Sequence, residues 1–239
     1  MASSRTSRQR PAGIGGQVQR RAAERARRTR RFVLIVVAVL ALLGGLYAVY
    51  ATATRQPPGA GRAAGGSGYP FQVGQPGPGA PAPGFSLAAT IGGTVDLTSL
   101  RGKTVLLYFQ EGLSCQPCWD QLTDLEKNSE AVRAAGIDQV ISITTDPVDL
   151  IARKTHDMGI HTTVLSDPDL TVSKAYDANA YGMMGDSRDG HTFILVRPDG
   201  TIGWRADYGG APKYTMFLPT SAVLADLHAA TATATGATP

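Results

Sequence analysis

The run Thr104–Phe109, TVLLYF, contains no charged residue and consists almost entirely of apolar and aromatic side chains. A strand with one face in solvent alternates apolar and polar residues, whereas a continuous run of this kind is typical of a strand buried on both faces. A domain built around such a strand must cover both faces of its sheet. The sequence therefore predicts an α/β domain with three layers and a central sheet.

The other predicted elements alternate between strands and helices along residues 85–229. Strands are predicted at 85–87 and 94–97 as one hairpin, at 140–143 and 164–165, and at 192–197 and 201–206 as a second hairpin. Helices are predicted from the cysteines to Gly136, after Asp146-Pro147 and Asp167-Pro168 with each acid as the cap, and over 221–229. Hairpins and helical connections together imply a mixed sheet.

The N-terminal part of the chain has the charge pattern of a membrane anchor. Residues 1–31 contain ten arginines and one acid, and residues 32–50 contain no charge. At about 1.5 Å per residue this second stretch is long enough to cross a hydrocarbon core of about 30 Å. The arginines crowd its start, so the positive-inside rule places the N-terminus in the cytoplasm. We expect a cytoplasmic tail over 1–31 and a transmembrane helix over 32–50 that contacts the lipid bilayer, with no nucleic-acid partner.

Two alternatives for the apolar stretch remain open, a cleaved signal peptide ending near Ala51-Thr52-Ala53 and a buried helix of a soluble protein. The anchor and the signal peptide both place the domain outside the cytoplasm, where thiols tend to form disulfides. With the anchor, the domain is held at the cell membrane. Residues 51–84 contain sixteen glycines and prolines and are expected to form a flexible linker. The globular domain is expected over 85–229, followed by a disordered tail over 230–239.

Cys115 and Cys118, in the stretch LSCQPCW, are the two cysteines of the chain. They fall between the predicted buried strand and the next helix, and a helix N-terminus stabilises a thiolate. Their spacing on a first helical turn brings the two sulfurs to one side, so that a mixed disulfide on one can be attacked by the other. Pro117 fits an early helical position, where its missing N–H is harmless.

The Cys-x-Pro-Cys motif resembles that of the thioredoxin superfamily, and its surroundings resemble the alkyl hydroperoxide reductase and thiol-specific antioxidant family. The similar stretches are APGFSL, VDLTSLRGKTVLLYF (95–109), LSDPDLTVSKAY (165–176) and TFILVRPDGTIGW (192–204). The resemblance implies a thioredoxin-like fold and a thiol-dependent oxidoreductase that reduces disulfides or peroxides, an antioxidant activity. It also implies that Cys115 is the exposed attacking thiol and that Cys118, flanked by Trp119, is the resolving one.

We expect no cofactor, and we expect a reducing partner in or across the membrane. The chain departs from the family at two positions. Family members have a Thr or Ser three residues before the attacking cysteine, where this chain has Gly112. Similar domains have an Arg or a cis-proline shortly before the later strand, where this chain has Gly190. Arg188 is close enough in sequence to reach the site, although a solvated loop arginine is the simpler interpretation. Glu111 is either a proton relay or a solvent-facing loop acid.

Rival interpretations of the cysteines concern metals and structure. A structural zinc site needs four ligands, and the chain has no second cysteine pair to supply them. Covalent haem attachment needs a histidine after the second cysteine, where this chain has Trp119. The pair could also be an inert structural disulfide, or the domain could serve only for interaction with other proteins. The strongest rival is a copper-delivery protein resembling the Sco type, with Cys115, Cys118 and His191 as ligands. In that family the two cysteines are spaced one residue wider than here.

Overall fold

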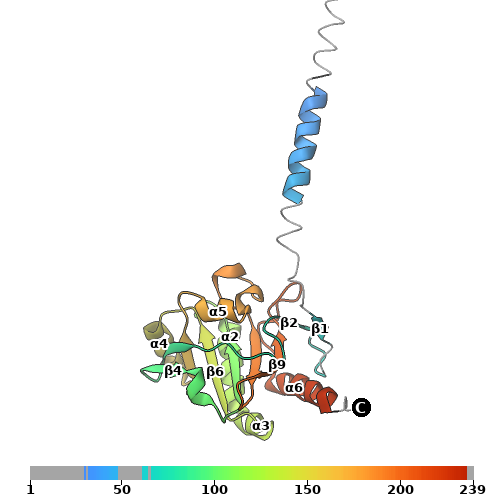
Figure 1. The fold of residues 1–239 in the computed structure, drawn as a ribbon. Coiled ribbons are helices and arrows are strands. Elements are labelled where there is room, and N and C mark those ends of the chain that lie inside the picture. Colours follow the sequence, from blue (N-terminus) through green and yellow to red (C-terminus); the bar gives the residue numbers. More distant parts are fainter. Residues whose placement is uncertain (1–29, 31, 48–60, 64–65, 236–239) are drawn as a thin grey trace, which may run out of the picture. The chain divides into compact units, whose positions relative to one another are not determined.

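The computed structural model describes residue 30 and residues 32–47, 61–63 and 66–235 (Figure 1). The chain divides into two compact units, Met1–Gln56 and Pro57–Pro239. In the first unit residues 32–47 are helical. Among the described residues, no helix combines the length and the apolar character needed to cross a membrane. Most of the predicted tail over 1–31, the end of the predicted span at 48–50 and residues 51–60 of the predicted linker lie outside the described residues.

The second unit is built on a mixed sheet with the predicted central strand in its middle. Its strands, in their order across the sheet, are β1 (Gly61–Ala63), β2 (Phe71–Val73), β9 (Ile202–Asp207), β8 (Thr192–Val196), β5 (Val105–Phe109), β6 (Gln139–Thr144), β7 (Thr163–Ser166), β3 (Ser86–Ala89) and β4 (Thr94–Asp96). β5, β6 and β7 are parallel, and the other neighbours are antiparallel. Both predicted hairpins and the mixed sheet are confirmed.

The helices and 3-10 turns connect these strands. They are η1 (Leu97–Leu100), α2 (Gln116–Lys127), α3 (Ser129–Ala134), α4 (Val148–Met158), α5 (Thr171–Ala175), η2 (Ala178–Ala180), η3 (Gly185–Ser187) and α6 (Thr220–Thr235). The predicted helix from the cysteines to Gly136 is therefore interrupted at Asn128, between α2 and α3.

The two faces of β5 enter two separate cores, because side chains alternate along a strand. Leu106 and Tyr108 pack in the core that contains residues of α2, α3, α4 and α6. Leu107 and Phe109 pack in the core that contains residues of α5, η1, η2 and β3. The three-layer prediction is confirmed, and all five residues of β5 are buried, as the apolar run indicated.

The structure moves the start of the domain toward the N-terminus. β2 pairs with β9 through Gln72 and Asp207, Phe71 is buried in the core, and Pro81 forms a bridge with Thr201. The prediction that 51–84 is a flexible linker is therefore wrong for its second half, because residues 66–84 pack on the domain. At the other end, α6 runs to Thr235, past the predicted limit of 229.

The two acid-proline pairs behave differently from the prediction. α4 begins after Pro147, and Asp146 makes no side-chain cap of that helix. Asp167 does accept the N–H groups of Val172 and Ser173 in α5, at 3.3 and 2.7 Å, although the helix begins only at Thr171. The capping prediction is thus wrong for Asp146, whose carboxylate is engaged elsewhere.

Candidate active site

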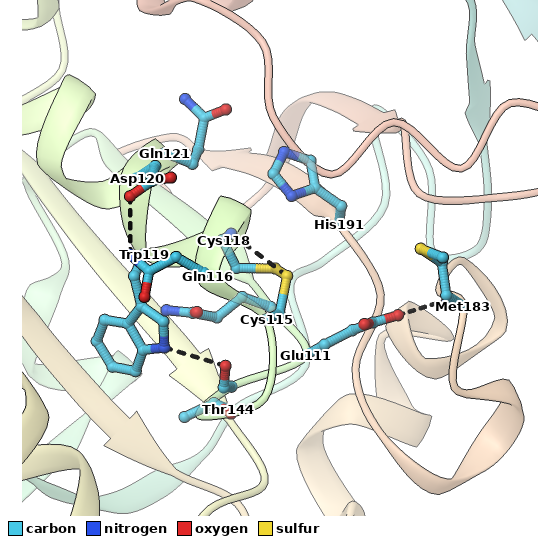
Figure 2. Close-up of a disulfide and its surroundings, with 12 residues drawn as sticks. Glu111, Cys115, Gln116, Cys118, Trp119, Asp120, Gln121, Thr144, Met183 and His191 are labelled. Carbon is cyan, nitrogen blue, oxygen red and sulfur yellow. Dashed lines mark hydrogen bonds between the residues drawn. A yellow bond between two sulfur atoms is a disulfide. The ribbon is translucent and has the colours of Figure 1, made fainter.

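Cys115 and Cys118 lie where β5 connects to α2, and they form a disulfide (Figure 2). The S–S distance is 2.13 Å and the two Cα atoms are 5.4 Å apart. Cys115 is the residue before the first turn of α2, and Pro117 is in that turn, where no intrahelical partner for its nitrogen is needed. The expectation that the spacing brings the two sulfurs together is confirmed.

The first turn of α2 directs a backbone donor at the sulfur of Cys115. The Cys118 N–H donates to Cys115 Sγ over 3.3 Å, and the Cys115 N–H donates to the Gly112 carbonyl over 2.9 Å. A donor at the positive end of a helix lowers the energy of an ionised sulfur relative to a thiol. This geometry suits Cys115 for attack as a thiolate.

The disulfide is less accessible than the sequence suggested. Cys115 is 6% exposed and Cys118 is 0% exposed. Cys115 is nearer to the surface, which agrees with the expected order, but the expectation of an exposed Cys115 is wrong in this oxidised form. Met216 packs with the two cysteines in a small apolar cluster of its own.

Trp119 anchors the loop before the cysteines. Its ring is fully buried in the main core, and its Nε1–H donates to the Gly112 carbonyl over 3.0 Å (Figure 2). The Lys154 ammonium lies 5.9 Å from the centre of the ring. Trp119 therefore fixes the backbone from which Cys115 projects and does not reach the surface as a substrate contact.

Gly112 departs from the family pattern for a steric reason. Its φ is +84°, and a Cβ built on it would lie 1.8 Å from Asp146 Oδ2 and 2.3 Å from Thr144 Oγ1. A threonine or serine fits neither the backbone angle nor the space. Asp146 thus occupies the volume that a side chain at position 112 would need.

Asp146 is a site residue that the sequence analysis took for a helix cap. Its Oδ2 accepts the Leu113 N–H over 2.6 Å, and its Oδ1 accepts from Arg188 Nη1 over 2.9 Å. Arg188 also donates to the Glu111 carbonyl over 3.1 Å. The interpretation of Arg188 as a solvated loop arginine is therefore wrong, since it joins the loop before the cysteines to the loop before β8.

Glu111 is buried, so the interpretation as a solvent-facing acid is wrong as well. Its Oε1 accepts the backbone N–H of Met183 in the loop between η2 and η3 (Figure 2). Together with Arg188, this contact holds the loop that follows α5 against the loop that carries Cys115.

His191 is buried, and Tyr108 links it to Cys118. Its Nδ1 is 3.0 Å from the Tyr108 hydroxyl, which donates to the Cys118 carbonyl over 3.3 Å. Burial lowers the pKa of His191 to about 3, so the ring is neutral at physiological pH. Tyr108 was not expected at the site, because its place in an apolar strand gave no sign that its hydroxyl reaches the helix.

The alternative copper site does not assemble in this form of the protein. Within the described residues, no group of three or more histidine, cysteine or acidic side chains has the arrangement of metal ligands. Both sulfurs are joined to each other, and Nδ1 of His191 is engaged by Tyr108, although its buried Nε2 has no hydrogen-bond partner among the described residues. The donor set therefore does not fit a resident copper ion here.

Sequence comparison finds a family and close relatives. The sequence model of the AhpC/TSA family matches residues 78–205, more than half of the chain. Peroxiredoxin Bcp of Escherichia coli K12 is 32% identical over 124 residues, which are 51% of this chain and 79% of that protein. A putative peroxiredoxin of Mycobacterium tuberculosis H37Rv is 34% identical over 130 residues, 52% of this chain and 81% of that protein.

Solved structures agree on the fold. Peroxidoxin BcpB from Mycobacterium tuberculosis superposes with a TM-score of 0.54 at 18% identity, covering 64% of this chain and 96% of that one. AhpC from Enterococcus faecalis gives a TM-score of 0.54 at 15% identity, covering 66% and 95%. The domain has the thioredoxin-like fold of peroxiredoxins, and with these relatives and its close cysteine pair the protein is a thiol-dependent oxidoreductase. The matched segment contains both cysteines, and the chain belongs to the AhpC/TSA family.

Proposed function

We propose that Cys115 is the attacking thiolate and Cys118 the resolving thiol of an enzyme that reduces disulfides, and reduces peroxides at a modest rate. The observation that carries this assignment is the Cys118 N–H directed at Cys115 Sγ at the start of α2. The lower exposure of Cys118 supports the order of the two roles, because the first attack needs the more accessible sulfur.

The cycle balances with a dithiol reductant. With a peroxide ROOH, the Cys115 thiolate attacks one oxygen, the O–O bond breaks, and ROH leaves once the alkoxide takes a proton. The resulting Cys115 sulfenic acid is attacked by Cys118, water leaves, and the Cys115–Cys118 disulfide forms. With a disulfide substrate, Cys115 forms a mixed disulfide that Cys118 resolves. In both cases a partner with two thiols returns two electrons to the pair.

The neighbours of the cysteines support this chemistry by position. Gly112 brings no hydroxyl to the site, and Arg188 is held by Asp146. Because neither residue is then free to hold a peroxide, we expect only a modest rate with peroxide. We assign Pro117, Trp119, Glu111 and Arg188 the supporting role of fixing the loop and helix start that carry Cys115.

We further propose that residues 32–50 anchor the chain in the cell membrane with the N-terminus in the cytoplasm and the domain outside. The uncharged stretch and the arginines before it support this topology. A reductant in or across the membrane would then supply the electrons. Carbonate washing and external protease on intact spheroplasts provide the test, and a chain that washes off, or a domain that the protease cannot reach, would contradict the anchor.

The catalytic assignment is tested on the full-length chain in detergent, with insulin and hydrogen peroxide as substrates and dithiothreitol as reductant. We expect Cys115→Ser and Cys118→Ser each to abolish catalytic turnover, and Cys118→Ser to accumulate a mixed disulfide on Cys115 with insulin. Ser114→Ala is the matched control, because this exposed neighbour should not change the rate. Turnover of both substrates by both cysteine variants would refute the assignment.

A further inference from the structure

The Cys115–Cys118 disulfide can be reduced only if a thiol reaches one of its sulfurs, and the side chain of Met216 packs against it. In the part of the chain that the structure describes, Met216 is the only apolar residue that clusters with the two cysteines. Met216 is 8% exposed, Cys115 is 6% exposed and Cys118 is 0% exposed. A thiol that attacks a disulfide needs contact with the sulfur itself. In the conformation of the structure, that contact is restricted.

The backbone around Met216 is fixed on both sides. The Thr215 N–H donates to the Tyr208 carbonyl over 3.1 Å, and the Leu218 N–H donates to Gln121 Oε1 over 2.9 Å. Gln121 belongs to α2, the helix that carries Cys118. The first bond closes the segment between β9 and α6 on itself immediately before Met216, and the second ties the segment to α2 shortly after Met216.

Two aromatic side chains near Met216 lie at the surface. Tyr214 and Phe217 are 43% and 41% exposed, in contrast to Met216. The segment therefore turns Met216 onto the disulfide between two exposed aromatic side chains, while Leu218, further along, enters the main core. Methionine is suited to a cover that must move, because its unbranched side chain changes rotamer at little cost without a shift of the backbone.

We propose that Met216 is the gate of the active site, whose displacement admits the thiol of the reductant to Cys115. This inference rests on the proposed function, in which the pair is oxidised and reduced in every cycle. In the gated step the reductant thiolate attacks Cys115 Sγ, the S–S bond breaks, and Cys118 leaves as a thiolate that takes up a proton. A second thiol of the same reductant then attacks the mixed disulfide, releases Cys115 and leaves as a disulfide.

A gate of this kind discriminates between reductants by size. A small dithiol can use a partial opening beside Met216, whereas a thiol on a protein surface needs the side chain out of the way. Met216 should therefore slow reduction by a protein more than reduction by a small molecule. The gate then selects which reductant supplies the electrons.

The test measures the rate of disulfide reduction in the oxidised full-length chain in detergent, by acid quench and alkylation of the new thiols. The reductants are dithiothreitol and a reduced thioredoxin. We expect Met216→Ala to raise the rate constant with thioredoxin by about tenfold, the factor that corresponds to about 1.4 kcal/mol. The rate constant with dithiothreitol should rise less, and Met216→Leu, which keeps the volume, should stay closer to the wild type than Met216→Ala with both.

Phe217→Ala controls for simple loosening of the segment, since Phe217 is adjacent but exposed. Urea unfolding of each variant verifies that the domain remains folded. Unchanged rates in Met216→Ala would overturn the gate, and so would an equal acceleration in Phe217→Ala. Failure of the proposed function looks different, because a wild-type pair that neither reductant reduces would remove the redox cycle itself, and the gate with it.

Discussion

Replacing Gly112 by alanine tests how the loop before the cysteines is held. At φ +84° an L-residue pays about 1–2 kcal/mol for the left-handed conformation. The new Cβ would also collide with Asp146, whose carboxylate accepts from the Leu113 N–H and from Arg188. Losing one such bond to a charged group costs about 1.5–3 kcal/mol.

Gly102 provides a matched control on the same domain. Its φ is +85°, and a Cβ built on it would meet no atom within 4 Å. We therefore expect Gly102→Ala to lower the free energy of unfolding by about 1–2 kcal/mol, and Gly112→Ala by about 3–5 kcal/mol. Both variants carry the cost of an alanine at positive φ. The difference between their free energies of unfolding therefore measures the cost of displacing Asp146.

Urea unfolding followed by tryptophan fluorescence is a suitable assay, because Trp119 and Trp204 both lie in the domain core. Equal destabilisation by the two alanines would mean that Asp146 does not fill the space beside Gly112. The steric explanation for the missing family hydroxyl would then be wrong.

Two further predictions concern His191 and the start of the domain. Burial holds the pKa of His191 at about 3 in the folded protein, below its unfolded value of 6.5, so the folded state binds fewer protons and stability is lost as pH falls through this range. From pH 7 to pH 5 the wild type should lose about 2 kcal/mol relative to His191→Asn in urea unfolding, and parallel pH profiles would contradict the burial of a neutral ring. The comparison with the variant is needed because burial raises the pKa of Asp189. Protonation of Asp189 in the folded state therefore increases stability as pH falls, opposite to the effect of His191. A chain that begins at residue 61, and so keeps β1 paired with β2, should unfold at the same urea concentration as the full-length protein. One that begins at residue 85 loses the buried Phe71 and should be less stable by at least about 3 kcal/mol, and equal midpoints would restore the linker interpretation.

The sequence was a good guide to the centre of the domain, because burial imposes a pattern on contiguous residues. The apolar run of β5 indicated its two covered faces, and the glycine and proline turns marked both hairpins. The cysteine pair was placed correctly between β5 and α2 for the same reason. These features depend on local periodicity and local turn chemistry.

Features that depend on contacts between distant residues were not predicted. The glycine- and proline-rich composition of 66–84 suggested a tether, but Phe71 fills a core position and β2 pairs with an edge that the sequence does not display. Asp146 carried the pattern of a helix cap, and only the fold brings Arg188 and Leu113 to it. Met216 and Tyr108 likewise gave no local signal, since packing alone places them at the cysteines.

The identity of the attacking sulfur can be measured directly. Reduced full-length Cys118→Ser is exposed to one equivalent of hydrogen peroxide in the presence of dimedone, which traps sulfenic acids, and the adduct is located by mass spectrometry. The account predicts one adduct, on Cys115, and none on Cys118 in the reciprocal Cys115→Ser variant. An adduct on Cys118, or no adduct on Cys115, would contradict it.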